Sequence, residues 1–472
     1  MIVVAVALLS AGCEKIKDFG DTNVNPNGTA VPSTAALLTN VLAGLGGLAA
    51  QTSPGLYAQQ FSETQYTEAS LYALPKLEFD GNYAGGLMDL QNIININTDA
   101  STKDNATKFG ANANQIATAR IMKAYILWTI TDRWGDVPYF EALKGSENLS
   151  PVYDTQETIY KDLIKELREA SAQFQPAAAK TQGDIIYAGD VSKWRKFANS
   201  LRMLMALRTS KVYPGANDFA ATEFRAAFQD AAGYIATNAD NFTVRYPGTV
   251  AAFSNPWWGL YNGRTDFAES KFMTDLMASL SDPRQAAFGS STNGFPYGLT
   301  RDQAVAFGTN YATILAANKR DRSSPLVVVG ASDVLLAIAE AAQRGWITAN
   351  IASTYQNAIV ENWAEWGVTG NITNYLANTS VALTGAASDL QKIQLQQYIS
   401  FYPDGLQAWS NWRRTGIPAL TPTPNAINSS KQIPRRLTYG NNEYSLNLAH
   451  VNEAITRLSD GDTPDSRVWW DK

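Results

Sequence analysis

The chain has 472 residues and a formal net charge of −5 at pH 7, and it contains one cysteine and one histidine. This length suffices for a large buried core, the mild acidity argues against nucleic acid as a partner, and a lone cysteine cannot form an internal disulfide. Only 17% of the residues are charged, whereas 21 are tyrosine and 12 are tryptophan. This composition suits neutral polar ligands, because rings and amides can replace water around hydroxyl groups and C–H faces.

Residues 1–32 have the features of a lipoprotein precursor. Val3–Leu9 is an apolar run that is too short to span a bilayer and is typical of a signal peptide. Small residues follow it and lead directly to Cys13, which we expect to carry the lipid that anchors the mature protein. The predicted boundaries are a signal peptide over 1–12 and a lipidated tether over 13–32, rich in Asn, Gly and Pro. No later segment is expected to cross a membrane.

From residue 33 onward, apolar periodicity predicts a mainly α-helical chain. Apolar residues recur every three or four positions, in runs whose spacing is typical of paired helices. The predicted pairs are Ser33–Phe61 with Leu87–Ile96, Asn112–Ile130 with Glu157–Gln173, Val191–Ser210 with Thr222–Thr237, and Ser332–Arg344 with Ser353–Trp366. The expected N-caps of three of these helices are Asp154, Ser332 and Ser353. We find no linker in this region and therefore expect a single domain over 33–472.

The segment Thr131–Ala142 (TDRWGDVPYFEA) is the most distinctive in the chain. Gly135 supplies a break after the long helix, and Pro138 disfavours a helical backbone at the residue before it. We interpret the segment as a structural corner in which Trp134 packs inward and Arg133 pairs with a carboxylate. A ligand site is the less favoured alternative, because large aromatic side chains are more often buried than exposed.

Two later regions, 238–330 and 370–472, are rich in Gly, Asn, Pro and aromatic residues. The second still contains two clear helices, Asp389–Phe401 and Leu406–Trp412. The first lacks helical periodicity over a length that usually indicates function or short strands. We therefore expect a loop-rich capping part with short strands, and we place the irregular, ligand-binding part within these two regions.

The first candidate ligand site is Asn255–Phe267 (NPWWGLYNGRTDF). Adjacent tryptophans point to different sides, so at least one ring should be exposed as a platform for a sugar ring, with amide, guanidinium and carboxylate groups for its hydroxyls. A packed loop is the alternative. The candidate residues are Trp257, Trp258, Tyr261, Asn262, Arg264 and Asp266, and a second set consists of Tyr66, Tyr72 and Tyr83.

Other chemistry has little support in the sequence. One histidine, His450, and one cysteine leave no zinc site and no catalytic triad, and neither a phosphate-binding nor a dinucleotide-binding glycine motif is present. We expect no cofactor, no metal and no catalytic residue. Glycoside hydrolysis needs only two carboxylates, and the nearest sequence pairs are Asp132 with Asp136, Asp266 with Glu269, and Glu361 with Glu365.

A late cluster of arginines, Arg413, Arg414, Arg435 and Arg436, stands among aromatic residues. Internal ion pairing is the favoured interpretation, and anion binding is the alternative.

Several separated motifs resemble the SusD/RagB family of nutrient-binding outer-membrane lipoproteins, in the branch with the corner sequence DRWGDVPY. The resemblance covers nearly the whole mature chain. Its motifs are Asn23–Pro26, Asp132–Tyr139, Tyr153-Asp154, Tyr187–Asp190 with Trp194, Ala198–Leu201, Arg264–Phe267, Asp282–Arg284, Ala339–Ala341 with Arg344–Trp346, Trp409–Pro418, Ile433–Arg436 and Trp469-Trp470.

This resemblance implies four tetratricopeptide-like helical hairpins with a loop-rich capping part. It also implies attachment to the outer face of the outer membrane through acylated Cys13, and a TonB-dependent SusC-like transporter as the partner. Members are generally non-enzymatic and capture a glycan or, in some branches, a peptide. Only Cys13 can be carried over as a functional position, because ligand contacts differ between members.

Our hypothesis is therefore glycan capture for a transporter; the alternatives are peptide capture and, less favoured, a surface glycoside hydrolase. We expect Trp257→Ala and Trp258→Ala to abolish glycan binding while leaving thermal stability nearly unchanged.

Overall fold

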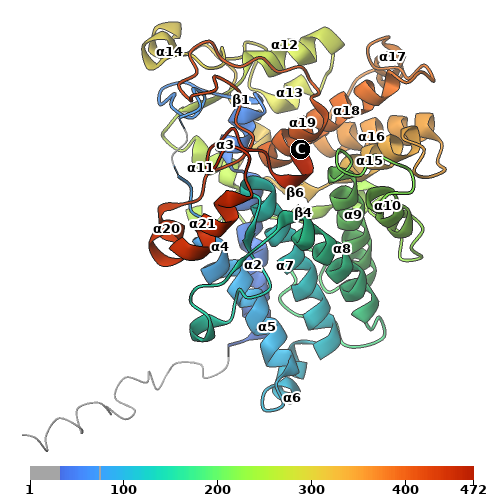
Figure 1. Cartoon of the computed structure of the whole chain (residues 1–472). Coiled ribbons are helices and arrows are strands. Elements are labelled where there is room, and N and C mark those ends of the chain that lie inside the picture. The colour runs from blue at the N-terminus through green and yellow to red at the C-terminus, as the bar shows by residue number, and fades with distance from the viewer. Residues whose placement is uncertain (1–31, 74–75) are drawn as a thin grey trace, which may run out of the picture. The chain divides into compact units, whose positions relative to one another are not determined.

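Helices dominate the described part of the chain, residues 32–73 and 76–472 of a computed structural model, and the strands are few and short (Figure 1). The expectation of a mainly α-helical fold is confirmed. The predicted signal peptide over 1–12, Cys13 and almost all of the tether over 13–32 lie outside the described residues.

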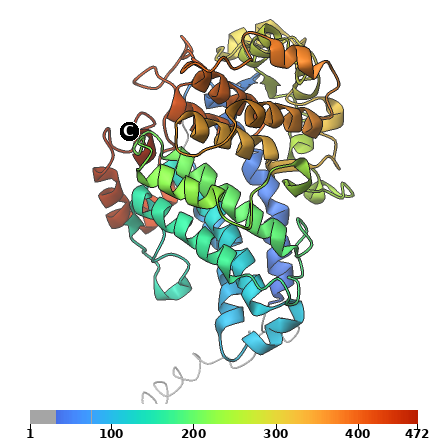
Figure 2. The same cartoon turned by 90° about the vertical axis from the view of Figure 1, so that its right-hand side faces the viewer.

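The four predicted helix pairs are confirmed as packed neighbours. They are α2 (Thr34–Ala49) with α5 (Met88–Thr98), α7 (Asn112–Trp134) with α8 (Gln156–Gln173), α9 (Val191–Arg208) with α10 (Phe219–Phe228), and α15 (Ala331–Gln343) with α16 (Ile351–Trp366). Successive pairs also pack on each other, through α5 with α7, α8 with α9, and α9 with α15 (Figure 2). Helix α7 is buried along most of its length because it is covered by α5, α8 and α9. We call these four pairs the helical stack.

Local chemistry shifts several helix boundaries from their predicted positions. Helix α8 is capped by Thr155, whose hydroxyl accepts from the Thr158 amide, because the neighbouring Asp154 is held in a strand and accepts from the amides of Tyr139 and Phe140. The prediction of Asp154 as the cap is wrong.

Two further caps and one helix end also differ from the prediction. Gly330 is the N-cap of α15 and Asn350 is the N-cap of α16, so Ser332 and Ser353 lie inside these helices. Helix α10 ends at Phe228 rather than Thr237, and Gly233 adopts a positive φ in the turn that follows.

Within the described residues, Thr34–Tyr57 has the length and mean hydropathy, 1.3, of a membrane span. By composition alone, the expectation that no later segment could cross a membrane is therefore wrong. The segment is divided into α2 and α3 (Thr52–Tyr57), and α2 packs against α5, β4 (Phe242–Val244) and β6 (Leu326–Val329). In this fold it is a core helix with one face buried, including Leu38, Leu42 and Leu45.

Three two-stranded antiparallel sheets connect distant parts of the chain. β1 (Phe61–Glu63) pairs with β5 (Phe267–Glu269), β2 (Val137–Pro138) pairs with β3 (Tyr153–Asp154), and β4 pairs with β6. Because β4, β5 and β6 lie within 238–330, the expected short strands of the loop-rich part are confirmed.

That region also contains a helix that sequence periodicity did not predict, α12 (Lys271–Leu280), capped by Ser270. The remaining α-helices are α4 (Asp80–Asn82), α6 (Lys103–Ala106), α11 (Pro256–Leu260), α13 (Gln285–Phe288), α14 (Arg301–Phe307), α17 (Ile372–Ala377), α18 (Asp389–Ser400), α19 (Gly405–Thr415), α20 (Asn441–Leu446) and α21 (Leu448–Thr456). Short turns of other helix types are Tyr83–Leu87, Thr107–Phe109, Gly145–Glu147, Asn238–Asp240, Ala251–Phe253, Ala317–Lys319 and Trp469–Asp471.

The corner that follows α7 is structural, as predicted. Gly135 ends the helix at φ +88°, and the indole N–H of Trp134 donates to the Thr438 carbonyl at 3.0 Å. Asp132 is buried and accepts from the Trp470 indole at 2.9 Å and from the Tyr160 hydroxyl. Arg133, also buried, donates to the carbonyl of Thr129 and to the Gln51 side chain rather than to a carboxylate.

The late arginines are used internally, which confirms the favoured interpretation. Arg414 forms a bidentate pair with buried Glu340, at 2.6 and 2.7 Å. Arg436 pairs with Asp462 and Arg435 with Asp471, while Arg413 lies 3.7 Å from the Trp409 ring centroid. These contacts fix the C-terminal loops to α19 and to the corner.

Candidate functional site

The pairing of β1 with β5 brings two sequence-predicted segments together at the surface. Their antiparallel register continues beyond the strands, because the Thr64 amide donates to the Asp266 carbonyl at 2.9 Å and the Thr64 hydroxyl donates to the Thr265 carbonyl at 2.5 Å. The loop after β1 is closed by buried Glu63, which accepts from the amide and hydroxyl of Ser70 at 2.8 and 2.7 Å. Burial raises the pKa of Glu63 in spite of these bonds. This arrangement holds Tyr66 beside Arg264.

Tyr66 is the centre of the candidate site. Its side chain is 48% exposed, and two guanidinium groups lie near its ring, that of Arg264 at 5.8 Å and that of Arg301 at 5.9 Å from the centroid. Both distances fall within the range of cation–π attraction. Arg264 also pairs with Asp266, yet its own side chain remains 64% exposed. We call Tyr66, Arg264, Asp266 and Arg301 the tyrosine platform.

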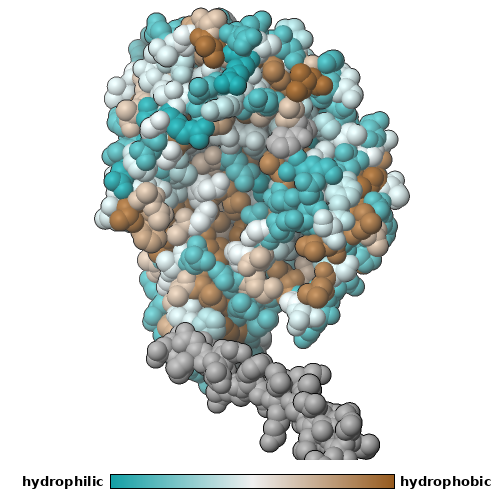
Figure 3. All heavy atoms as spheres, turned by 90° about the vertical axis from the view of Figure 1, so that its left-hand side faces the viewer, coloured by the Kyte–Doolittle hydropathy of each residue, from teal (hydrophilic) through white to brown (hydrophobic). Residues whose placement is uncertain are grey.

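Helix α14 extends the platform with apolar surface. A Thr300–Gln303 capping box starts the helix, so Arg301 occupies its first position and is held close to the ring of Tyr66. Val305 and Phe307, farther along the helix, are 62% and 41% exposed, and Phe307 packs on buried Phe295. Figure 3 shows the face that carries α11, α14 and α20, where hydrophobic residues form separate patches among hydrophilic ones.

Trp258 is a second, smaller ring surface. It lies in α11, which Asn255 caps by accepting from the Trp257 amide at 2.8 Å. The Trp258 side chain is partly exposed, with the Arg322 guanidinium 4.7 Å from its ring centroid. Exposed Phe253 lies in the short turn just before α11.

Two other residues of the same segment make internal contacts. Trp257 is 1% exposed and packs edge-on against Phe61, so its ring does not form a platform on the outer surface. The hydroxyl of Tyr261 donates to the Phe267 carbonyl and accepts from the Ile314 amide, while Arg320 covers its ring at 4.3 Å. Both side chains position the loop. Asn262, by contrast, is exposed in the turn that follows α11.

The structure separates the three tyrosines of the second predicted set. Tyr72 is buried, and its hydroxyl accepts from the Thr423 amide. Tyr83 is partly buried near the corner, where its hydroxyl donates to the Pro138 carbonyl at 2.6 Å. Only Tyr66 is both exposed and next to the first predicted set.

Sequence reasoning missed Arg301, Arg322 and Phe307. The capping-box spacing of Thr300 and Gln303 was a signal for a helix that begins at Arg301. Nothing local indicates that this helix lies beside residues more than two hundred positions earlier in the chain.

The candidate carboxylate pairs are not arranged around an open cleft. Asp132 and Asp136 belong to the corner, and Asp136 pairs with Arg457 at 2.5 Å. Glu269 is fully buried with Gln285 as a partner, and burial raises its pKa to about 8. Glu361 accepts from the Asn238 amide at 2.8 Å, which ties α16 to the following loop. Within the described residues, no group of three or more His, Cys, Asp or Glu side chains is placed to hold a metal ion.

The sequence and fold of this chain match those of known proteins. Residues 26–440 match the family model of SusD-like proteins, described as starch-binding and associating with the outer membrane. Among solved structures, a chitin-binding protein is 27% identical, with a TM-score of 0.78 over 93% of this chain and 99% of its own. A chitin-binding SusD homologue from Flavobacterium johnsoniae (24% identity, TM-score 0.80, 93% of this chain and 98% of its own) and a SusD homologue from Bacteroides uniformis (24%, 0.77, 93% and 99%) share the fold.

No curated protein sequence gives a significant match.

Proposed function

The chain belongs to the SusD-like family of starch-binding, outer-membrane-associating proteins, and on that premise we propose that it captures glycans at the tyrosine platform. The observation that supports this assignment is the exposed ring of Tyr66 with two guanidinium groups near it, on a loop fixed by the β1–β5 pairing. The aromatic face of Tyr66 can stack on the C–H groups of a sugar ring. The guanidinium groups can donate hydrogen bonds to the sugar hydroxyls, and Asp266 can accept hydrogen bonds from them.

The expected affinity is weak. A ring contact of this kind contributes roughly 0.5–1.5 kcal/mol beyond the area it buries, and each 1.4 kcal/mol changes the dissociation constant about tenfold. One main ring with a few polar partners therefore supports capture that is easily reversed, which suits a protein that passes its ligand on.

Calorimetry with starch-derived and chitin-derived oligosaccharides tests the proposal. Chitin fragments belong in the panel because the relative that is 27% identical is a chitin-binding protein. We expect Tyr66→Ala to weaken binding about tenfold, through loss of the stacking face, without lowering the thermal midpoint. Phe140→Ala is the matched control, since Phe140 is 50% exposed but packs on Tyr139 beyond the corner.

Equal affinity in wild type and Tyr66→Ala would contradict the platform assignment. Binding of peptides but of no oligosaccharide would instead favour the peptide-capture alternative.

We further propose that capture is non-catalytic and serves a TonB-dependent SusC-like transporter, with the chain anchored through lipid on Cys13. In each carboxylate pair considered for hydrolysis one acid, namely Asp136, Glu269 or Glu361, is engaged in an internal contact, which supports binding without turnover. Co-purification of a transporter from outer membranes with the wild-type chain, and loss of membrane attachment in Cys13→Ser, are the expected results. Release of reducing ends during incubation with the bound glycan would contradict the non-catalytic assignment.

A further inference from the structure

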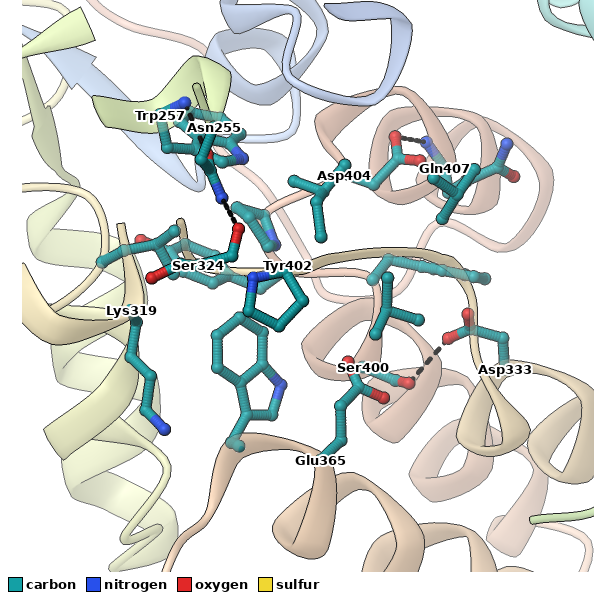
Figure 4. A pocket seen from close by; sticks show the side chains of 18 of the residues that line it. Asn255, Trp257, Lys319, Ser324, Asp333, Glu365, Ser400, Tyr402, Asp404 and Gln407 are labelled. Carbon is teal, nitrogen blue, oxygen red and sulfur yellow. Dashed lines mark hydrogen bonds between the residues drawn. The ribbon is translucent and has the colours of Figure 1, made fainter. Parts of the chain in front are cut away.

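A second polar cavity lies away from the tyrosine platform, where the loop-rich part meets the helical stack. It has a volume of about 190 Å³ and is lined by residues of α11, β6, α15, α16 and α19 and of the segment after α18. In Figure 4, Asp333, Glu365 and Ser400 lie at one end and Asn255 and Trp257 at the other, with Lys319 to the side. A cavity of about 150 Å³ accepts one six-membered ring such as benzene, so this one is large enough for a single ring.

The walls combine aromatic faces with hydrogen-bonding groups that the protein leaves unused. Trp257 and Trp366 both line the cavity, and their buried indole N–H groups have no hydrogen-bond partner among the described residues. Such a buried donor costs free energy unless something accepts from it. The Glu365 carboxyl group likewise makes no hydrogen bond or ion pair with any described residue.

Other polar groups around the cavity are only partly satisfied. Asp333 accepts from the Ser400 hydroxyl at 2.8 Å and from the Gly330 amide at 2.9 Å. Asp404 accepts the amides of Leu406 and Gln407 with one carboxylate oxygen, Oδ1. Residues with unused hydrogen-bonding capacity therefore line the same space.

The acids of this cavity favour a neutral occupant over a cation. Burial raises the pKa of Asp333 to about 6, that of Asp404 to about 7 and that of Glu365 to about 8, and the charge of Asp333 adds to the effect on Glu365. A carboxyl group that retains its proton at neutral pH, as that of Glu365 does, can donate a hydrogen bond as well as accept one.

An open groove borders this cavity. The groove has a volume of about 680 Å³ and runs beside α13 and the segment after α16. It shares Asn318, Lys319 and Trp366 with the cavity, so these three side chains stand between solvent and the inner space. Trp366 itself is partly exposed.

We propose that the cavity is a second ligand site that holds one neutral polyhydroxy ring, of the size of a monosaccharide, which enters past Trp366. The ring's hydroxyl groups would accept from the two indole N–H groups and share hydrogen bonds with Glu365 and Asp404. Hydroxyl groups suit this mixed lining because each can both donate and accept. The site is separate from the tyrosine platform and does not depend on it.

The test uses the whole chain with 15N-labelled tryptophan, observed through its indole N–H signals by NMR. Trp257→Phe and Trp366→Phe assign the two cavity signals, and glucose and N-acetylglucosamine are titrated as separate probes. We expect both cavity signals to shift and to saturate together, while the Trp258 signal stays in place. Glu365→Met, which keeps the side-chain length but removes the hydrogen-bonding carboxyl group, should weaken this titration about tenfold.

Tyr66→Ala separates this site from the platform. The cavity titration should be unchanged in that variant, even where oligosaccharide binding is lost. The proposal is overturned if neither monosaccharide moves the cavity signals, which would mean that the cavity holds only water. It is also overturned if the shifts disappear in Tyr66→Ala, because they would then originate at the platform. Trp366→Phe, at a partly exposed position, keeps the assignment possible should Trp257→Phe fail to fold.

Discussion

The helical stack and the loop-rich rim (residues 238–330) place similar side chains in opposite situations. Against the stack, Arg414 of α19 is buried and forms a bidentate pair with Glu340 of α15, so its charge is fully used inside the fold. On the rim, Arg264 pairs with Asp266 and approaches Tyr66, but most of its side chain remains in solvent. An arginine beside an aromatic ring is therefore no guide to function by itself. Burial decides whether its hydrogen bonds support the fold or remain available for a ligand.

The largest expected effect is the loss of the buried pair between α19 and the stack. Burial alone would raise the pKa of Glu340, but the charge of Arg414 outweighs it and holds that pKa well below its usual range. Arg414→Ala removes the bidentate partner of buried Glu340, leaves that carboxylate with Arg344 as its cation, and should lower the free energy of unfolding by about 3–5 kcal/mol. Urea denaturation measures this loss, and a change below about 1 kcal/mol would show that water replaces the arginine.

Adjacent tryptophans on the rim provide the next comparison. Trp257 is 1% exposed and Trp258 is partly exposed, although both lie in the same turn of α11. Trp257→Ala should cost about 3–5 kcal/mol of stability by opening a cavity next to Phe61. This corrects the sequence-based expectation that its stability would be unchanged.

Trp258→Ala is the matched variant and should cost less than about 1 kcal/mol. Denaturation of the two variants under identical conditions distinguishes a packing residue from a surface one. Similar losses in both would contradict the difference in burial.

Glu269, a buried carboxylic acid of the loop-rich rim, should make the free energy of unfolding depend on pH. Burial raises the pKa of Glu269 to about 8, so the folded chain holds a proton between about pH 4.5 and 8 that the unfolded chain releases. Because the folded state then binds more protons, the free energy of unfolding should fall as the pH rises from 5 to 8, by up to about 1.4 kcal/mol per pH unit from this group. Glu269→Gln cannot titrate, so the wild type should lose stability relative to this variant over that range. Parallel pH profiles would show that Glu269 ionises normally.

The smallest effect on stability is expected at the platform arginine. Arg264→Gln removes an exposed ion pair and should change the free energy of unfolding by less than about 1 kcal/mol. Glycan affinity should nevertheless fall several-fold, because a donor and a cation–π partner of Tyr66 are lost. Calorimetry and denaturation on the same sample give both values, and a stability loss comparable to that of Arg414→Ala would place Arg264 with the structural arginines.

The helices of the stack could be predicted because burial against neighbours imposes a regular apolar spacing on the sequence. Their caps were harder to predict, since Asp154 and Thr155 are equally plausible by type and only the pairing of β2 with β3 selects between them. Helix α12 was missed although Met273, Met277 and Leu280 form a buried stripe, because the segments around it are rich in turn residues.

The platform could be predicted only in part. Tyr66 and Arg264 are recognisable as candidates by residue type, but their contact depends on strands of three residues each, which leave almost no periodic signal. The remaining candidate residues differ in burial, which the sequence does not reveal. Trp257 and Tyr72 are buried because tertiary packing covers them.

The β1–β5 pairing has a consequence for how this protein can change over evolutionary time. Its hydrogen bonds join backbone to backbone, so they are largely indifferent to which side chains the loops on either side carry. Positions such as Tyr66 and Asn262 can therefore be replaced without loosening the frame that displays them. Diversity in the nutrients that are recognised can then arise from a handful of exposed positions, while the paired strands beneath them stay under selection for folding.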